Sequence, residues 1–325
     1  MTRRRFLEAL AILALSGTAS AEEDTCRIRV SGPAVAETLP LLVMTRPGGM
    51  SEMTRTVTFT PWNSPDQLRA MIATAKVDAA LMTTASACTL GNKSVPTAVV
   101  ALFSSPVWLV STDTSLSSLS GLQGREVLLS FGPGEMPDLL LRALARQAGV
   151  QFTPRHVGNA LEAVNLVLLG RGDCALLSEP AATLAVSRAG TRTRPGAPIP
   201  AKRLDIRDAW REAFPEHPEL ALGALAMVGP LAADAAARGE LRESYFRAAG
   251  WVAAHPRQAV SLAREEFPAL GSQAVDGVLP GTDIRLVKGP AGEEAARFFL
   301  GLLHDMSPAS IGGRLPGPEF FEVAA

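Results

Sequence analysis

A duplicated segment constrains the fold more than any other feature of this sequence. The segment 76–87, KVDAALMTTASA, aligns with the segment 171–182, RGDCALLSEPAA. In each copy a polar turn with an aspartate leads into a short apolar run, which is followed by a small polar loop and a helix start. Short apolar runs between turns are typical of buried strands in parallel sheets. The repeat therefore predicts two similar lobes, each built around its own sheet.

The rest of the chain shows the same alternation of strands and helices. Strand-like segments lie at 27–30, 55–60, 98–103, 107–111 and 126–131, and helical patterns lie at 34–44 and 137–148. A further helix is predicted after Ser64, a helix-capping residue that Pro65 follows. The alternation predicts an α/β fold of mostly parallel sheets flanked by helices.

The first 21 residues have the three parts of a secretory signal. Arginines at 3–5 precede an apolar run at 9–15, and the small residues ASA at 19–21 precede Glu22. The run is about half of the ~20 residues that a bilayer-spanning helix needs. We therefore expect cleavage after Ala21, export to the periplasm and no permanent membrane anchor. The arginines before Phe6 also resemble a twin-arginine signal, from which Glu8 departs, so twin-arginine and Sec export both stay open.

Composition argues against nucleic acid as a partner. The chain has a formal net charge of −1, and it contains one Tyr and four Trp. A basic face and aromatic stacking platforms are what nucleic-acid binding requires. We therefore expect no nucleic-acid partner.

The three cysteines are too few and too irregularly spaced for a disulfide framework or a zinc site. Cys174 lies in an apolar run and is predicted to be a small core residue. Whether Cys26 and Cys88 pair with each other in an oxidising compartment stays open.

Polar loops follow the repeated strands. Because the loops at the carboxyl ends of parallel strands form the ligand crevice, loops 83–86 and 178–180 should face each other across one cleft. Loop 130–137 has two glycines and starts a helix, whose amides can hold an anion without a charged side chain. The residues that we expect to contact a ligand are Gly32, Trp62, Thr83, Thr84, Ser86, Ser105, Ser130, Gly132, Gly134, Glu135, Ser178 and Glu179.

Each of these assignments has a structural alternative. The hydroxyl residues can serve as N-caps for the helices that follow, and Glu135 can be a first-turn residue favoured by the helix dipole. Trp62 and Trp108 are both candidates for an apolar wall, and one of them is expected in the core. If Glu135 or Glu179 faces the ligand, an amine-bearing or neutral solute is favoured over an inorganic anion. No Arg or Lys projects from the expected cleft loops, which argues against nitrate-like specificity.

The order of elements, the paired D-x-A-L units and the Glu179-Pro180 turn resemble the periplasmic solute-binding proteins of ABC importers. The similar branch includes the nitrate, sulfonate and taurine binders and the thiamine-precursor binders. Other matching pieces are LSGLQG at 119–124, PRQA at 256–259 and IGGRLP at 311–316. The resemblance covers nearly the whole mature chain.

The resemblance implies a type II periplasmic-binding-protein fold, in which the chain crosses between two lobes twice. The crossings would lie near Ser111 and at 220–227, which assigns 26–111 plus 221–325 to the first lobe and 112–220 to the second. The implied function is capture of a small organic or anionic ligand by hinge closure of the lobes. A monomer would then deliver the ligand to the permease of an ABC importer.

Two alternatives stay open. One is a periplasmic sensor of the same fold, or a carrier of a cofactor precursor or sulfur compound. The other is an enzyme, because some desulfinating enzymes share the fold. Common hydrolase, metalloprotease and nucleotide-binding motifs are absent from the sequence, and no His lies close in sequence to Cys88, the one candidate nucleophile. We therefore expect no catalytic residue, no cofactor and no metal.

Overall fold

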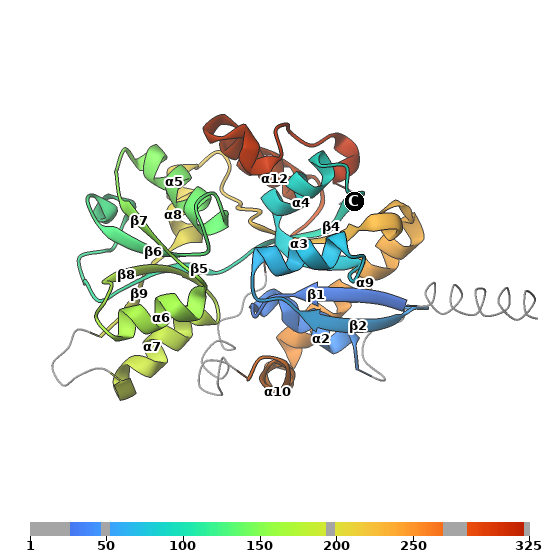
Figure 1. Cartoon of the computed structure of the whole chain (residues 1–325), viewed down its shortest axis with the longest axis horizontal. Coiled ribbons are helices and arrows are strands. Elements are labelled where there is room, and N and C mark those ends of the chain that lie inside the picture. The colour runs from blue at the N-terminus through green and yellow to red at the C-terminus, as the bar shows by residue number, and fades with distance from the viewer. Residues whose placement is uncertain (1–26, 47–52, 193–198, 269–284, 322–325) are drawn as a thin grey trace, which may run out of the picture.

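Two α/β lobes lie side by side in the computed structural model (Figure 1). The structure describes residues 27–46, 53–192, 199–268 and 285–321. The expected signal segment and Cys26 lie outside these residues. Each lobe has its own sheet, as the duplicated segment predicts, and the lobes meet along the middle of the molecule.

The first lobe contains a six-stranded sheet in the order β11-β4-β10-β3-β1-β2. β1, β2 and β3 pair in parallel, whereas β10 pairs antiparallel to both β3 and β4. Because β10 is antiparallel to both of its neighbours, β1 to β4 run in one direction. β11 is antiparallel to β4. The strands are β1 (Arg27–Gly32), β2 (Thr56–Pro61), β3 (Ala79–Thr83), β4 (Thr97–Ser104), β10 (Gly223–Val228) and β11 (Arg285–Val287).

Helices cover both faces of this sheet, because β3, β4 and β10 consist almost wholly of buried residues. One face carries the 3-10 turn η1 (Ala36–Thr38), α2 (Leu39–Met44), α9 (Ala235–Ala254) and α10 (Pro256–Glu266). The other carries α3 (Pro65–Ala73), α4 (Thr84–Asn92) and α12 (Gly289–Met306). As predicted, Ser64 caps α3, since its hydroxyl accepts a hydrogen bond from the Gln67 amide at 3.2 Å.

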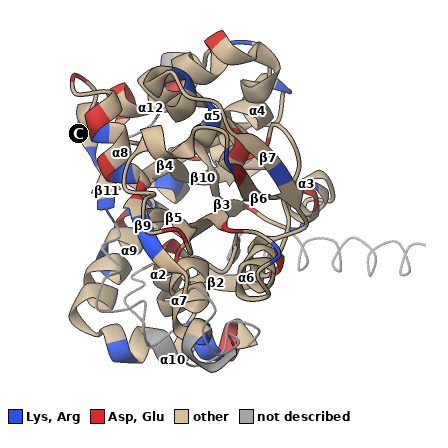
Figure 2. Ribbon diagram, turned by 90° about the vertical axis from the view of Figure 1, so that its left-hand side faces the viewer, with Lys and Arg blue, Asp and Glu red and all other residues tan. Residues whose placement is uncertain are grey.

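The second lobe contains a five-stranded sheet in the order β7-β6-β8-β5-β9. β6 pairs in parallel with β7 and β8, and only β5 runs against its neighbours. The strands are β5 (Val107–Ser111), β6 (Glu126–Ser130), β7 (Thr153–Val157), β8 (Cys174–Ser178) and β9 (Ala201–Asp205). The helices α5 (Met136–Ala148) and α8 (Ile206–Ala213) pack on one face, and α6 (Ala160–Leu168) and α7 (Ala181–Arg192) pack on the other (Figure 2).

The first passage between the sheets lies earlier than we expected. β4 ends at Ser104 in the first sheet, and β5 pairs with β8 and β9 in the second from Val107 onward. The chain therefore passes at Ser105 and Pro106 rather than near Ser111. Two apolar runs separated by a few residues carry no signal of which sheet each joins. The return to the first sheet enters β10 at Gly223, within the expected interval.

Aromatic side chains of α8 and of the return passage pack against aromatic side chains of α12. Trp210 of α8 is fully buried, and its ring lies 5.7 Å from that of Phe299 on α12. His217, on the return passage, stacks on Phe298 with ring centroids 3.9 Å apart. Besides the first lobe, α12 packs against the second lobe (red in Figure 1), because its apolar face continues into the same core as α5 and α8.

Candidate functional site

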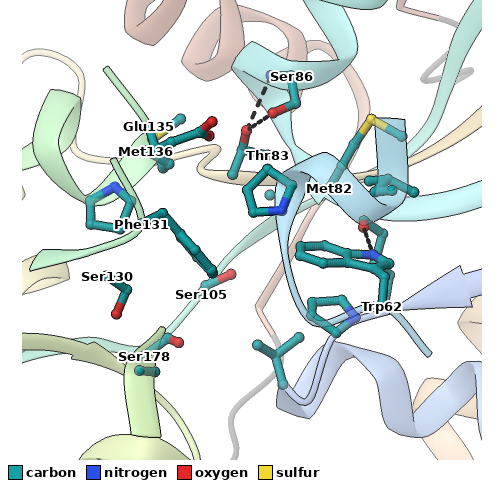
Figure 3. A pocket seen from close by; sticks show the side chains of 18 of the residues that line it. Trp62, Met82, Thr83, Ser86, Ser105, Ser130, Phe131, Glu135, Met136 and Ser178 are labelled. Atoms are coloured by element: carbon teal, nitrogen blue, oxygen red, sulfur yellow. Dashed lines mark hydrogen bonds between the residues drawn. The ribbon is translucent and has the colours of Figure 1, made fainter. Parts of the chain in front are cut away.

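A cleft of about 800 Å³ lies between the lobes. Its walls come from the segments that follow the carboxyl ends of β1, β2, β3, β4, β6, β7 and β8. The loops of the duplicated segment, after β3 and β8, lie on opposite sides of it (Figure 3). A cavity of this size at the strand ends of open sheets is a common location for a small-molecule site.

Most of the residues that we expected to contact a ligand line this cleft. They are Trp62, Thr83, Ser86, Ser105, Ser130, Gly134, Glu135, Ser178 and Glu179. Ser105 lies between the two walls, at the passage from one sheet to the other (Figure 3).

Three expected residues do not line the cleft. At Gly32 a Cβ atom would lie 2.7 Å from the hydroxyl oxygen of Thr38, so this glycine permits close packing. Thr84 is fully buried, and its hydroxyl donates to the carbonyl of Ala221 at 2.7 Å. Gly132 belongs to the loop after β6, but its neighbours Phe131 and Gly134 form the lining. The position of a residue on a loop does not show whether that residue or its neighbour lines the cleft.

Two aromatic side chains form apolar walls. Trp62 donates its indole N–H to the carbonyl of Leu81 at 3.1 Å, which fixes the ring beside the cleft. Phe131 extends from the opposite lobe (Figure 3) and was missed from sequence. Its φ of 72° is left-handed, a conformation that is rare outside glycine and often found at functional sites. Trp108 lies outside the lining, and the Lys202 ammonium lies 5.3 Å from its ring centre.

The cleft hydroxyls differ in their partners. Thr83 caps α4: its hydroxyl accepts from the Ser86 amide at 3.1 Å and donates to the Ser86 hydroxyl at 2.8 Å (Figure 3). In the described part of the chain, the hydroxyls of Ser130 and Ser178 have no protein partner. Hydroxyls both donate and accept, so these two are suited to bind a polar group of a ligand.

Three amides of the loop before α5 are already bonded within the protein. The Gly134 amide donates to the carboxylate of Asp138 at 3.0 Å, and the Glu135 amide donates to the Gly132 carbonyl at 3.2 Å. The amide of Phe131 is bonded to Val157. A carboxylate of the protein therefore occupies the position at which an anion would be held.

Glu179 and Glu135 are both engaged in ion pairs. Glu179 is buried, pairs with Lys202, and accepts a hydrogen bond from the Thr183 amide at 3.1 Å, so it caps α7. Glu135 accepts from Arg69 of α3 at 2.9 Å, across the cleft from one lobe to the other. Both carboxylates line the cleft and also have a structural role.

Glu37 is a cleft residue that could not be identified from the sequence pattern of the loops. Glu37 is among the residues that line the cleft, the residue is only 2% exposed, and its Oε1 has no hydrogen-bond partner among the described residues. Burial raises its pKa, against the opposing effects of its own amide, Ser105 and Arg207. Tyr245 holds the backbone in place by donating to the Glu37 carbonyl at 2.8 Å. A sequence signal exists, since Glu37 is the one charged residue in the apolar stretch 33–44.

Cys88 is unsuited to be a nucleophile in the cleft. It does not line the cavity, and burial raises the pKa of its thiol to about 11, so the thiol stays protonated at neutral pH. Its Sγ accepts from the Asn92 amide at 3.5 Å. Cys174 is buried in the core, as predicted.

Neither a metal site nor a membrane span is found within the described ranges. No group of three or more His, Cys, Asp and Glu side chains there could hold a metal ion. No helix in the same ranges is both long and apolar enough to cross a bilayer.

No family model matches the sequence, and no curated protein matches it significantly. Solved structures do match. An ABC transporter protein from Parabacteroides distasonis is 19% identical, with a TM-score of 0.69 over 91% of this chain and 98% of that one. The periplasmic aliphatic sulphonate binding protein of Escherichia coli is 13% identical, with a TM-score of 0.67 over 92% and 95%.

The periplasmic nitrate-binding protein of Synechocystis PCC 6803 is 13% identical, with a TM-score of 0.65 over 87% of this chain and 82% of that one. The expected two-lobed architecture is thereby confirmed. At such identities the likeness concerns the fold, and it extends over 82–98% of each chain. This chain therefore has the type II periplasmic-binding-protein fold.

Proposed function

We propose that this protein is an exported solute-binding protein, which captures a small organic molecule between its lobes and delivers it to the permease of an ABC importer. The observation that carries the proposal is the cleft of about 800 Å³ between two lobes that the chain joins by two passages. Such an arrangement lets the lobes close on a ligand by rotation at the passages. The solved proteins of the same fold include binding proteins for a sulphonate and for nitrate.

The chemistry of the lining supports binding rather than turnover. The aromatic walls Trp62 and Phe131 and the hydroxyls of Ser130 and Ser178 provide contact area and directed hydrogen bonds. Catalysis would need an activated nucleophile or a base within reach of one. Cys88 offers neither, since it is protonated and lies outside the lining.

A thermal-shift screen of the mature protein tests this proposal. The panel comprises sulphonates, nitrate, amino acids, pyrimidines and organic amines, and each compound that stabilises is then assayed for turnover. A ligand at a hundredfold excess over its dissociation constant stabilises by about 2.7 kcal/mol, which moves the melting temperature measurably. Stabilisation without conversion is the expected result. Conversion of the stabilising compound would identify an enzyme instead.

A further inference from the structure

The charged side chains of the cleft lining are predominantly acidic. Its described residues include the carboxyl groups Glu37, Glu135, Glu179 and Glu266 and a single cationic side chain, Arg69. The guanidinium of Arg69 already lies 2.9 Å from Glu135 and 2.9 Å from Asp66. Outside the lining, Lys202 pairs with Glu179 and Arg207 interacts electrostatically with Glu37. The lining itself carries more carboxyl groups than cations, and an excess of one charge attracts ligands of the opposite charge.

Side-chain oxygens also occupy the helix starts that face the cleft. Thr83 caps α4, Asn159 accepts from the Glu162 amide at 3.0 Å at the start of α6, and Glu179 caps α7. In front of α5 the carboxylate of Asp138 takes the Gly134 amide. Helix starts bind anions through amides that are not otherwise engaged. At each of these helix starts at least one amide is therefore engaged by a side chain of the protein and is not free to hold an anion.

Glu37 has a fixed backbone, but its Oε1, a hydrogen-bond acceptor, has no donor among the described residues. The backbone of Glu37 is fixed from behind by the buried Tyr245, and α2, which follows it, packs on α9. Removing a carboxyl oxygen from water without a hydrogen bond is costly, unless a partner arrives. The solute enters the cavity that Glu37 lines, so a donor on the solute is a suitable partner.

We infer that the solute is an organic cation, with an ammonium, amidinium or guanidinium group that donates to Glu37 and an apolar body that contacts Trp62 and Phe131. The inference rests on the proposed binding function and narrows its ligand class. A cationic donor would satisfy Oε1 and offset the acidic lining with one group, whereas a sulphonate or nitrate would meet like charge.

Three probes with one aromatic ring test the inference: benzamidine, benzamide and benzoate, which are cationic, neutral and anionic. Affinities are measured by calorimetry at millimolar probe concentrations, with the parent protein and Glu37→Gln. The control is Glu243→Gln, which makes the same substitution at an exposed position of α9. We expect the parent to bind benzamidine most tightly and benzoate least. Glu37→Gln should lose at least tenfold in benzamidine affinity, about 1.4 kcal/mol, and Glu243→Gln should lose none.

Retained benzamide binding by Glu37→Gln shows that the variant is folded. Benzoate binding as tight as benzamidine binding, unchanged benzamidine affinity in Glu37→Gln, or failure of the parent to bind benzamidine would each overturn the inference. These results would leave the proposed function in place if another compound of the thermal-shift panel binds. If no compound of that panel binds either, the binding function itself fails.

Discussion

Arg69 of α3 and Glu135 before α5 join the two lobes across the cleft, with Nη2 and Oε1 2.9 Å apart. Because the two side chains are 52% and 23% exposed, the pair contributes at most about 1 kcal/mol to closure. We predict that Glu135→Gln shifts the balance between closed and open lobes by up to about fivefold. Small-angle scattering of the ligand-free protein should show a larger radius of gyration.

The control for this pair is Asp66→Asn, which removes the partner of Arg69 within α3 and leaves the contact between the lobes intact. Its radius of gyration should equal that of the parent. Equal values for the parent and Glu135→Gln would mean that the ion pair does not hold the lobes together.

Thr84 connects α4 to the return passage rather than to a ligand. Its buried hydroxyl bonds to the Ala221 carbonyl, and its amide donates to the Leu222 carbonyl at 3.0 Å. Thr84→Val keeps the shape and leaves the Ala221 carbonyl without its donor, so it should lower the free energy of unfolding by about 1–3 kcal/mol. Urea denaturation measures this loss.

Thr74→Val is the matched control, because the Thr74 hydroxyl also bonds a backbone carbonyl but is exposed to solvent. It should change stability little. A drop in benzamidine affinity for Thr84→Val, with stability unchanged, would indicate that Thr84 belongs to the binding site.

The raised pKa of Glu37 makes the stability of the empty protein depend on pH. The folded protein holds this proton more tightly than the unfolded chain does. The stabilisation is full below the ordinary pKa of 4.5 and is lost as the pH rises through the folded value. Tyr245, which also packs against Glu37, stays neutral because burial raises its pKa well above 10.0.

Glu37→Gln cannot ionise, so its free energy of unfolding relative to the parent should increase as the pH rises above about 4.5. Urea denaturation of both proteins between acidic and neutral pH measures the difference. Relative to the parent, the variant should thus be more stable at neutral pH than at acidic pH while it loses benzamidine affinity, a combination typical of residues kept for function. A difference that stays constant with pH would show that Glu37 does not titrate between the two states.

The position of the cleft could be predicted from the sequence, whereas the strand pairing and the side-chain contacts around it could not. The duplicated segment placed the Thr83 and Ser178 loops on facing walls, because the direction of parallel strands determines where their loops converge. It could not show that Val107–Ser111 joins the second sheet, since pairing partners leave no trace in an apolar run. The engagement of the Gly134 amide by Asp138 likewise depends on a side-chain conformation that only the structure shows.

The amino-terminal arginines allow a test of the export route. Arg3→Lys combined with Arg4→Lys should block periplasmic accumulation if the twin-arginine route is used, whereas Sec export should tolerate the conservative change. Cell fractionation and immunoblotting measure the mature protein in each compartment. Normal accumulation of the double variant would exclude the twin-arginine route and leave export itself in place.

The most direct test of the account is the distance between the lobes with and without a solute. Spin labels are placed on Cys introduced at Ala73 of α3 and Arg146 of α5, both exposed, in a Cys26→Ser background. The buried Cys88 and Cys174, with pKa values of about 11 and 12, should resist labelling. Pulsed electron paramagnetic resonance then measures the distance between the labels without a solute and with the compound that stabilises the protein most. If the lobes close on the solute, the distance distribution becomes shorter and narrower when the compound is bound. An unchanged distribution would contradict binding by closure of the two lobes.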